Sequence, residues 1–137
     1  MKTVITFGTY DVFHLGHVKL LERAASLGDQ LIVGVSTDQM NFDKKQRYPV
    51  YSEDDRMTII SAMRYCNLCF KEESMEKKGE YIERYCADIL VMGDDWEGRF
   101  DRFRDQCEVV YLPRTPDVST TELLDVIASR QALSKAA

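Results

Sequence analysis

Short apolar runs alternate with longer amphipathic segments along the chain, and this alternation predicts the order of the secondary structure. Each run is four or five residues long and almost continuously apolar. Such runs are typical of strands that are buried on both faces. They predict strands over residues 4–7, 31–35, 66–70, 89–92 and 109–112. The segments between and after them predict helices over residues 18–27, 52–64, 77–85 and 119–133.

Residues that favour helix ends support several of these boundaries. Gly28 follows the first helical pattern and is a typical helix stop. Ser52 is an N-cap candidate with three acidic residues directly after it, where they complement the helix dipole. Ser119 and Glu122 have the spacing of a capping box. The segments that begin at Ser52 and Ser119 are therefore expected to start as helices.

Strands that alternate with helices in this way predict an α/β fold. We expect a single domain over residues 1–137, built on a doubly wound, parallel, five-stranded sheet. A closed barrel would need eight strand–helix units, for which the chain is too short. In open sheets of this kind the ligand binds beyond the carboxyl ends of the strands, where the winding reverses. The loops after the first, fourth and fifth strands are therefore the expected functional site.

Composition and charge narrow the classes of function. Apolar residues make up 45% of the chain and charged residues 30%, which is typical of a globular protein. The formal net charge is -5 and there is no basic stripe, so we expect no nucleic-acid partner. No apolar run approaches the ~20 residues of a membrane span, so no membrane insertion is expected. The N-terminal apolar stretch is too short for a signal peptide, which favours a cytoplasmic location.

The four cysteines could have structural or chemical roles. Cys66 and Cys69 have the CxxC spacing of zinc and redox sites. There is no second CxxC, and both cysteines lie inside an apolar run instead of at an exposed helix start. We therefore expect small, buried, structural cysteines, with a thiol or metal protein as the alternative.

Both histidines of the chain lie in the loop after the first predicted strand. His14 and His17 are three residues apart, in a segment bounded by Gly8 and Gly16 that leads into a helix. A helix N-terminus offers free N–H groups to a phosphate, and glycines let backbone approach a ligand closely. Two imidazoles beside it add donors that favour a phosphate site. A zinc pair is the alternative, although no third ligand is evident.

Three other segments carry candidate chemistry. Residues 93–101 hold four acids and the only tryptophan, which suits Mg²⁺, a sugar, a base or a solvated turn. Arg114 stands in the loop after the fifth strand, ahead of three hydroxyl residues at a helix start, where it can bind phosphate oxygens. The polar stretch 41–51 contains Lys44, Lys45 and Arg47, and its length is typical of a lid.

Taken together, these segments resemble the cytidylyltransferases of the HxGH nucleotidyltransferase superfamily, over nearly the whole chain. HLGH at 14–17 is the superfamily motif, and RTPDVSTT at 114–121 resembles the cytidylyltransferase branch. VMGDDWEGRFD at 91–101 and CEVVYLPRTP at 107–116 look like the group that acts on glycerol 3-phosphate. The resemblance implies a Rossmann-like nucleotidyltransferase fold.

The resemblance also implies an activity. The chain would transfer the cytidylyl group of CTP to a small phosphate monoester by direct in-line attack, giving pyrophosphate and, with glycerol 3-phosphate, CDP-glycerol for wall teichoic acid synthesis. Phosphoethanolamine, phosphocholine or a capsule precursor phosphate is the alternative acceptor. Mg²⁺ would accompany CTP, and the enzyme would be a homodimer. A non-catalytic nucleotide-binding module is the remaining alternative, against which the intact motifs argue.

By the same resemblance, roles are expected for particular residues. His14, His17, Lys44 and Arg114 would be catalytic. The nucleotide would contact Gly8, Thr9, Tyr10, Asp11, Gly16, Gly93, Asp94, Arg114, Thr115, Ser119 and Thr120. The acceptor side would contain Lys44, Arg56, Arg64 and Lys77, and Asp11 would be the carboxylate nearest the metal.

Overall fold

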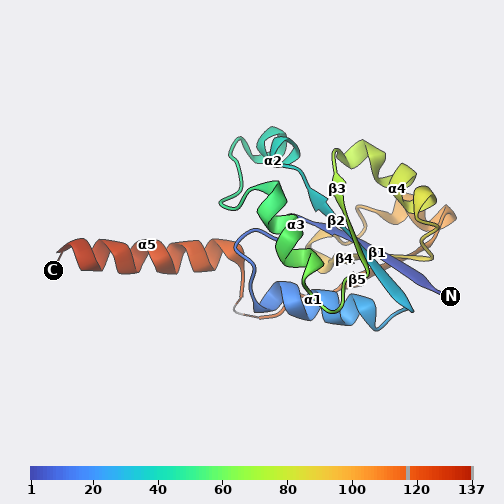
Figure 1. Cartoon of the computed structure of the whole chain (residues 1–137), viewed down its shortest axis with the longest axis horizontal. Helices are drawn as coiled ribbons and strands as arrows, with labels where there is room; N and C mark the ends of the chain where they lie inside the picture. Colours follow the sequence, from blue (N-terminus) through green and yellow to red (C-terminus); the bar gives the residue numbers. More distant parts are fainter. Residues whose placement is uncertain (117, 137) are drawn as a thin grey trace.

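Strands and helices alternate along the chain in the computed structural model, which describes residues 1–116 and 118–136 (Figure 1). Asp117, in the third loop motif, lies outside the described residues. Three 3₁₀ helices lie at Met75–Lys77, Asp94–Trp96 and Asp101–Asp105. The remaining elements are β1 (Thr3–Gly8), α1 (Leu15–Ala25), β2 (Gln30–Ser36), α2 (Asp38–Lys45), α3 (Glu53–Ser61), β3 (Leu68–Glu72), α4 (Lys78–Arg84), β4 (Ile89–Gly93), β5 (Glu108–Leu112) and α5 (Thr120–Ala136).

The strands form a parallel sheet in the order β3-β2-β1-β4-β5, which confirms the predicted doubly wound α/β fold. β1 is central, and the winding reverses between β1 and β4. In register, Gly8 at the end of β1 pairs with Val35, and Gly93 at the end of β4 pairs with Leu112. The carboxyl ends of these strands therefore meet at one edge of the sheet.

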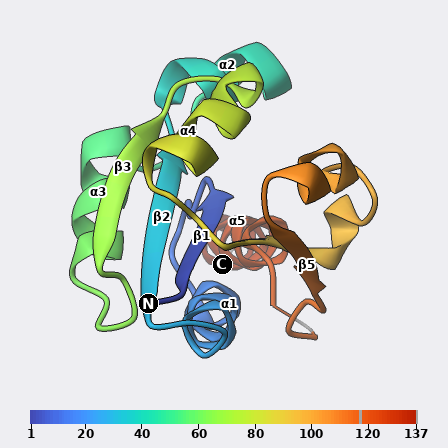
Figure 2. The same cartoon turned by 90° about the vertical axis from the view of Figure 1, so that its right-hand side faces the viewer.

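Two apolar clusters cover the two faces of the sheet, and the helices that pack on it are seen around the strands in Figure 2. On one face, α1 and α3 bury Leu21, Ala24 and Ile60 against β1, β2 and β4. On the other face, α4 buries Tyr81 and Ile82 beside the aromatic residues of the strands. Burial on both faces explains why the strand sequences are apolar throughout.

Three elements differ from the sequence-based expectation. α1 begins at Leu15, three residues earlier than predicted, because His14 caps it. α2 begins at Asp38 and extends to Lys45, into the stretch 41–51 that was expected to be a loop. It is polar and buries little beyond Asn41, so it has no apolar periodicity, and Thr37 caps its start. β3 begins at Leu68 and not at Cys66.

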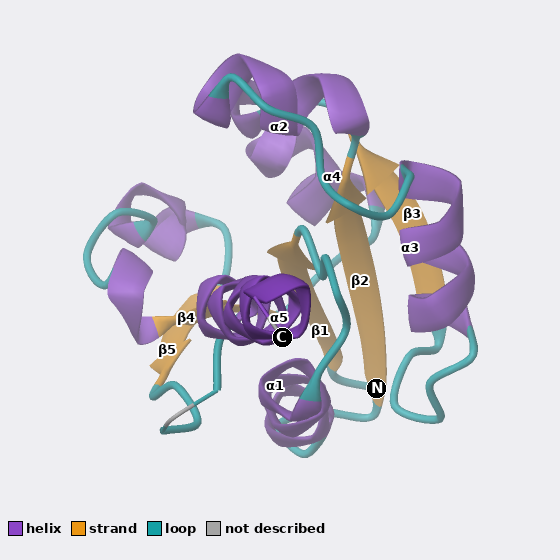
Figure 3. Ribbon diagram, turned by 90° about the vertical axis from the view of Figure 1, so that its left-hand side faces the viewer, coloured by secondary structure: helices purple, strands orange, loops and turns teal. Residues whose placement is uncertain are grey.

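The last helix, α5, begins beside the carboxyl edge of the sheet and extends away from the body of the molecule (Figures 1 and 3). Three apolar side chains on it are exposed, at Val126, Ile127 and Leu133. No helix among the described residues is both long and apolar enough to cross a membrane.

Candidate functional site

A cavity of about 450 Å³, called the first cavity below, opens at the point where the winding of the sheet reverses. Three loops that are distant in sequence line it, as the loop positions predict. The strap, defined as residues 46–51, forms part of its wall. The predicted residues that line it are Gly8, Thr9, Tyr10, Asp11, His14, Gly16, His17, Gly93, Arg114, Thr115, Ser119 and Thr120.

The two histidines are fixed by the turn that they form. His14 is the N-cap of α1, and its Nδ1 accepts a hydrogen bond of 3.0 Å from the Gly16 backbone N–H. The Nδ1 of His17 accepts a bond of 3.2 Å from the His14 backbone N–H. Phe13 and Tyr10 pack against the His17 ring, with centroids 5.3 and 5.4 Å away. The turn therefore acts as a capping box made of two imidazoles.

Burial disfavours the charged form of both imidazoles by lowering the pKa of each. It lowers the pKa of His17 to about 3, with a smaller contribution from His14. Burial also lowers the pKa of His14, and the positive charge of Arg114 lowers it further. Since each Nδ1 accepts a hydrogen bond, each neutral ring carries its proton on Nε2. Both histidines line the first cavity, and Nε2–H is the donor that each neutral ring has left for a ligand at this helix N-terminus.

Gly8 is required by a close approach of side chain to backbone. A Cβ at this position would lie 2.8 Å from the Tyr10 ring. Tyr10 itself has a positive φ of 55°, and its ring is buried beneath the loop. Burial raises the pKa of its hydroxyl, which has no hydrogen-bond partner among the described residues. Tyr10 therefore supports the loop from below, and the backbone of the loop faces the first cavity.

The loop before α5 adds a cation to the first cavity. Arg114 is exposed and lines this cavity, and no carboxylate in the described part of the chain lies within ion-pair distance of it. Ser119 caps α5 by accepting a hydrogen bond of 3.1 Å from the Glu122 N–H, as predicted. The Thr120 hydroxyl donates to the Asp11 carbonyl at 2.9 Å. This bond joins the start of α5 to the histidine loop.

Asp11 holds the strap against the site. Its two carboxylate oxygens accept hydrogen bonds from the Val50 and Tyr51 backbone N–H groups, at 2.8 and 2.9 Å. Arg47, Tyr48, Pro49 and Val50 of the strap line the first cavity. The carboxylate that the resemblance assigns to the metal is therefore already engaged with backbone donors.

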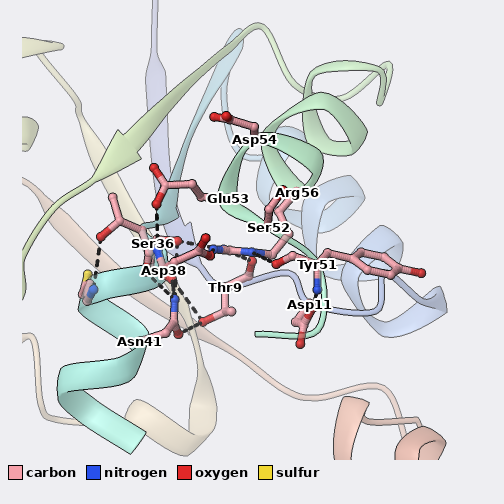
Figure 4. Close-up of polar contacts among 12 residues, drawn as sticks. Thr9, Asp11, Ser36, Asp38, Asn41, Tyr51, Ser52, Glu53, Asp54 and Arg56 are labelled. Atoms are coloured by element: carbon pink, nitrogen blue, oxygen red, sulfur yellow. Dashed lines mark hydrogen bonds and ion pairs between the residues drawn. The ribbon is translucent and has the colours of Figure 1, made fainter. Parts of the chain in front are cut away.

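A hydrogen-bonded network beneath the strap includes one predicted residue in an unexpected role (Figure 4). Arg56 is fully buried and donates to the carbonyls of Thr9, Ser36 and Tyr51 at 2.7–3.0 Å. It also forms an ion pair of 2.7 Å with Asp38. These bonds tie the strap to the ends of β1 and β2, so the guanidinium serves the structure of the site and is directed at the protein itself.

Asn41 belongs to the same network, although the sequence did not single it out. Its side chain is buried, accepts from the Thr9 hydroxyl at 2.8 Å, and donates to the Ser36 hydroxyl at 2.8 Å. It lines both the first cavity and a second one. The sequence held no signal for it, because the polar segment around Asn41 lacks the apolar period that reveals a helix and its buried face.

The second cavity, of about 390 Å³, adjoins the first along a shared wall that includes Thr9, Asn41, Lys45 and Trp96. Lys44 lines the second cavity, and its Nζ lies 4.0 Å from the centre of the Trp96 ring. Burial lowers the pKa of Lys44, and the positive charges of Lys45 and Lys78 act in the same direction. Basic side chains therefore gather on this side of the site.

A buried ion pair forms the floor of the second cavity. Glu72 and Lys78 are 2% and 1% exposed, and the Lys78 Nζ donates to Glu72 Oε2. The ammonium also lies 4.2 Å from the centre of the Phe7 ring. Burial raises the pKa of Glu72 and lowers that of Lys78, while the charge of each partner opposes the shift of the other. The sequence prediction did not include either residue.

Two predicted acceptor-side cations lie elsewhere. Lys77 is exposed and pairs with Glu73 at 2.9 Å, whereas its neighbour Lys78 points into the second cavity. Arg64 lies over Tyr65, and it lines neither cavity. The structure therefore brings Lys44 to the second cavity but not Lys77 or Arg64.

The loop after β4 contributes Gly93 and Asp95 to the first cavity, but not Asp94. A Cβ at Gly93 would lie 2.7 Å from Asp95 Oδ1, so this glycine allows the close approach of the Asp95 carboxylate. Trp96 follows in the 3₁₀ turn and packs on Phe100, with centroids 5.4 Å apart. The tryptophan of this loop is therefore part of the shared wall.

The described residues contain no candidate metal site, and the cysteines are not fully buried. In residues 1–116 and 118–136, no group of three or more His, Cys, Asp and Glu side chains is placed to hold a metal ion. The expectation of buried cysteines is wrong, since Cys86 is exposed and the other three are partly exposed. Cys66 precedes the edge strand β3, and Cys86 occupies the turn after α4 with a positive φ of 51°. Both cysteines therefore remain accessible to solvent, Cys66 in part and Cys86 fully enough to count as exposed.

Comparisons with known proteins agree with this architecture. Residues 5–126 match the family model described as cytidylyltransferase-like. A glycerol-3-phosphate cytidylyltransferase from Bacillus subtilis is 50% identical over 93% of this chain and 98% of its own length. One from Staphylococcus aureus is 42% identical over 96% and 99%. A lipopolysaccharide core biosynthesis protein from Thermoplasma volcanium shares the fold, with a TM-score of 0.72 and 20% identity over 84% and 98%.

Proposed function

The chain belongs to the cytidylyltransferase-like family, and from this membership we propose that it transfers the cytidylyl group of CTP to glycerol 3-phosphate, giving CDP-glycerol and pyrophosphate. It is a nucleotidyltransferase enzyme. The observation that carries the proposal is the imidazole capping box, in which His14 and His17 present two neutral Nε2–H donors to a cavity at a helix N-terminus. Identity of 50% to a protein of that activity over almost the whole chain supports it.

The triphosphate of CTP occupies the first cavity, beside the N-termini of α1 and α5. Phosphate groups suit this position because helix N-termini combine free N–H groups with a positive dipole end. Arg114 binds phosphate oxygens, and it is free to do so because no carboxylate pairs with it among the described residues. Thr115, Ser119 and Thr120 also line the first cavity. Cytosine and ribose lie toward Gly93, which lines this cavity, whereas the neighbouring Asp94 does not.

Transfer proceeds by direct attack. An oxygen of the acceptor phosphate forms a bond to the α-phosphorus of CTP, and the bond to the bridging oxygen of the β-phosphate breaks, so that pyrophosphate leaves. Negative charge on the equatorial and bridging oxygens increases during this step, and donors that are already oriented stabilise it. His14 and His17 supply such donors without a charge of their own, since their pKa values are lowered.

The acceptor occupies the second cavity, with its phosphate at the shared wall. Lys44 lines the second cavity with its ammonium over Trp96 of the shared wall, and Lys45 lines both cavities. These cations offset the charge that accumulates when two phosphates are brought together. Arg56 acts indirectly by fixing the strap and the strand ends.

Mg²⁺ would accompany CTP and would be held chiefly by the substrate's phosphate oxygens. This ion usually keeps several waters and binds through one or two carboxylates together with substrate phosphates. Asp11 remains the candidate carboxylate, although both of its oxygens accept backbone hydrogen bonds. The ion would neutralise charge on the triphosphate.

The experiment that tests the function is an acceptor panel. Purified protein is incubated with CTP, Mg²⁺ and one phosphate monoester, and pyrophosphate release is measured. We expect release with glycerol 3-phosphate and much slower release with phosphoethanolamine or phosphocholine. Release with another acceptor alone would show that the acceptor is wrong and cytidylyl transfer is right. No release with any acceptor would show that the activity itself is wrong.

The resemblance extends the proposal to a cytoplasmic homodimer that supplies CDP-glycerol for wall teichoic acid. Exposed apolar side chains on α5, at Val126, Ile127 and Leu133, are compatible with a partner subunit, since free apolar surface favours association. Light scattering on the purified protein checks the assembly. A monomer mass at assay concentrations would contradict the dimer without affecting the catalytic proposal.

A further inference from the structure

Glu72 holds a position at which a substrate contact would be effective. It is the last residue of β3, and its backbone carbonyl accepts a hydrogen bond of 3.0 Å from the Thr37 N–H, so its main chain is fixed. The side chain is 2% exposed and lies on the floor of the second cavity. Oε2 accepts from Lys78, while Oε1 takes part in none of the hydrogen bonds found among the described residues. One oxygen of a buried carboxylate thus retains its accepting capacity.

The surroundings of Glu72 make a purely structural role costly. Burying two charges removes them from water, and well-packed apolar residues of similar volume give equal or greater stability. Apolar side chains already form the rest of the floor, at Phe7, Met75 and Phe100. A buried pair in such a place is explained more simply if a polar ligand uses the charge.

The charge of the second cavity indicates how an acceptor is oriented in it. Three lysines and two carboxylates line the cavity, at Lys44, Lys45, Lys78, Glu72 and Asp95, so the lining has a net positive charge. The acceptor phosphate must lie at the wall shared with the first cavity, because it attacks the α-phosphorus there. The remainder of the acceptor then extends toward the buried floor, where it meets the Glu72–Lys78 pair.

We infer that Glu72 is a specificity-determining residue that accepts hydrogen bonds from the hydroxyl groups of the acceptor, with Lys78 holding its carboxylate in place. This inference rests on the proposed function and names the chemical class of its acceptor, a polyol monophosphate. A carboxylate oxygen accepts from O–H groups and offers nothing to an alkyl chain. A trimethylammonium group carries no N–H or O–H and so cannot donate a hydrogen bond to the free Glu72 oxygen.

The test compares two acceptors of equal length, glycerol 3-phosphate and n-propyl phosphate, which lacks both hydroxyl groups. For each protein, kcat/KM is measured with both acceptors and with CTP varied. Glu72→Gln is expected to reduce the preference for glycerol 3-phosphate about 10-fold or more, since hydrogen bonds to charged groups are strong. The KM for CTP should stay unchanged. Glu73→Gln alters the neighbouring exposed carboxylate and serves as the matched control, for which the preference should not change.

Glu72→Gln leaves Lys78 without its partner and could impair folding, so Glu72→Gln with Lys78→Met removes both charges together. This double variant should fold, as judged by circular dichroism, and should also lose the preference. Equal loss of kcat/KM with both acceptors, or an unchanged preference in a folded variant, overturns the inference alone. A wild-type enzyme that uses phosphocholine and not glycerol 3-phosphate overturns the proposed acceptor as well.

Discussion

His14 and His17 stack on one another with ring centroids 3.8 Å apart and planes inclined by 25°, and each Nδ1 accepts a hydrogen bond from the backbone of the same turn. The turn orients both rings before any ligand is present. Donors that need no reorientation stabilise charge that develops in a transition state more effectively than mobile ones. Loss of either ring is therefore expected to slow the transfer step.

Replacing His17 should reduce turnover far more than stability. His17→Ala removes one preoriented donor, and we expect kcat/KM for CTP to fall by a factor on the order of 10² or more. The helix loses the bond to the His14 N–H, a capping contact that contributes about 1 kcal/mol. Pyrophosphate release and chemical denaturation measure the two effects. An unchanged rate in the folded variant would mean that the triphosphate is held by other groups.

The lowered pKa of His17 predicts a pH dependence of stability. The folded protein binds this proton only near pH 3, whereas the unfolded chain binds it near pH 6.5. The unfolded state thus takes up more protons between these values, so stability falls as the pH decreases below about 6.5. Between pH 7.5 and pH 5 we expect a loss of about 2 kcal/mol from this group. Urea denaturation at both pH values checks it, and His17→Ala should show a smaller pH dependence.

Asp11 is predicted to control the strap. Asp11→Asn replaces one accepting oxygen by an NH₂ group, which opposes a backbone N–H of Val50 or Tyr51. The strap should loosen, and the KM for CTP should rise about 10-fold, because a hydrogen bond to a charged group is lost. Hydrogen exchange at the two amides should become faster. Unchanged exchange together with an altered Mg²⁺ requirement would instead identify Asp11 as a metal neighbour.

Arg56 and Arg64 should differ sharply in their effect on stability. Arg56→Ala removes a fully buried guanidinium that donates to three carbonyls and to Asp38. Loss of such a buried network costs about 3–5 kcal/mol of the free energy of unfolding. Arg64→Ala, outside this network, should change it by less than ~0.5 kcal/mol. Chemical denaturation of the two variants compares them, and similar values would contradict the structural role of Arg56.

Lys44 and Lys77 provide a second matched pair. Lys44→Gln removes a cation from the second cavity, so the KM for glycerol 3-phosphate should rise about 10-fold while the KM for CTP changes little. Lys77→Gln changes an exposed residue paired with Glu73, and its kinetic constants should match those of the wild type. Steady-state kinetics with each substrate varied decides between them. A larger effect at Lys77 would place the acceptor outside the second cavity.

Helix phase explains why the structure brings Lys78 to the second cavity and not Lys77, which the resemblance indicated. Lys77 and Lys78 are adjacent in sequence, but successive residues on a helix point about 100° apart. The packing of Tyr81 and Ile82 against the sheet sets the rotation of α4, and this rotation directs Lys78 inward. Glu72 ends β3, which runs two residues beyond the predicted strand at 66–70, so the apolar pattern did not place it at the edge where ligands bind.

The fold and the position of the site could both be predicted from the order of apolar runs along the chain. Those runs specify a parallel sheet, and a parallel sheet brings the carboxyl ends of its strands to one edge, so the loops with His14 and Arg114 had to lie near each other. Which charged residues face the cavities became evident only once the elements were packed together. Burial of Arg56, Glu72 and Lys78 depends on contacts between elements far apart in sequence, and no local pattern records those contacts.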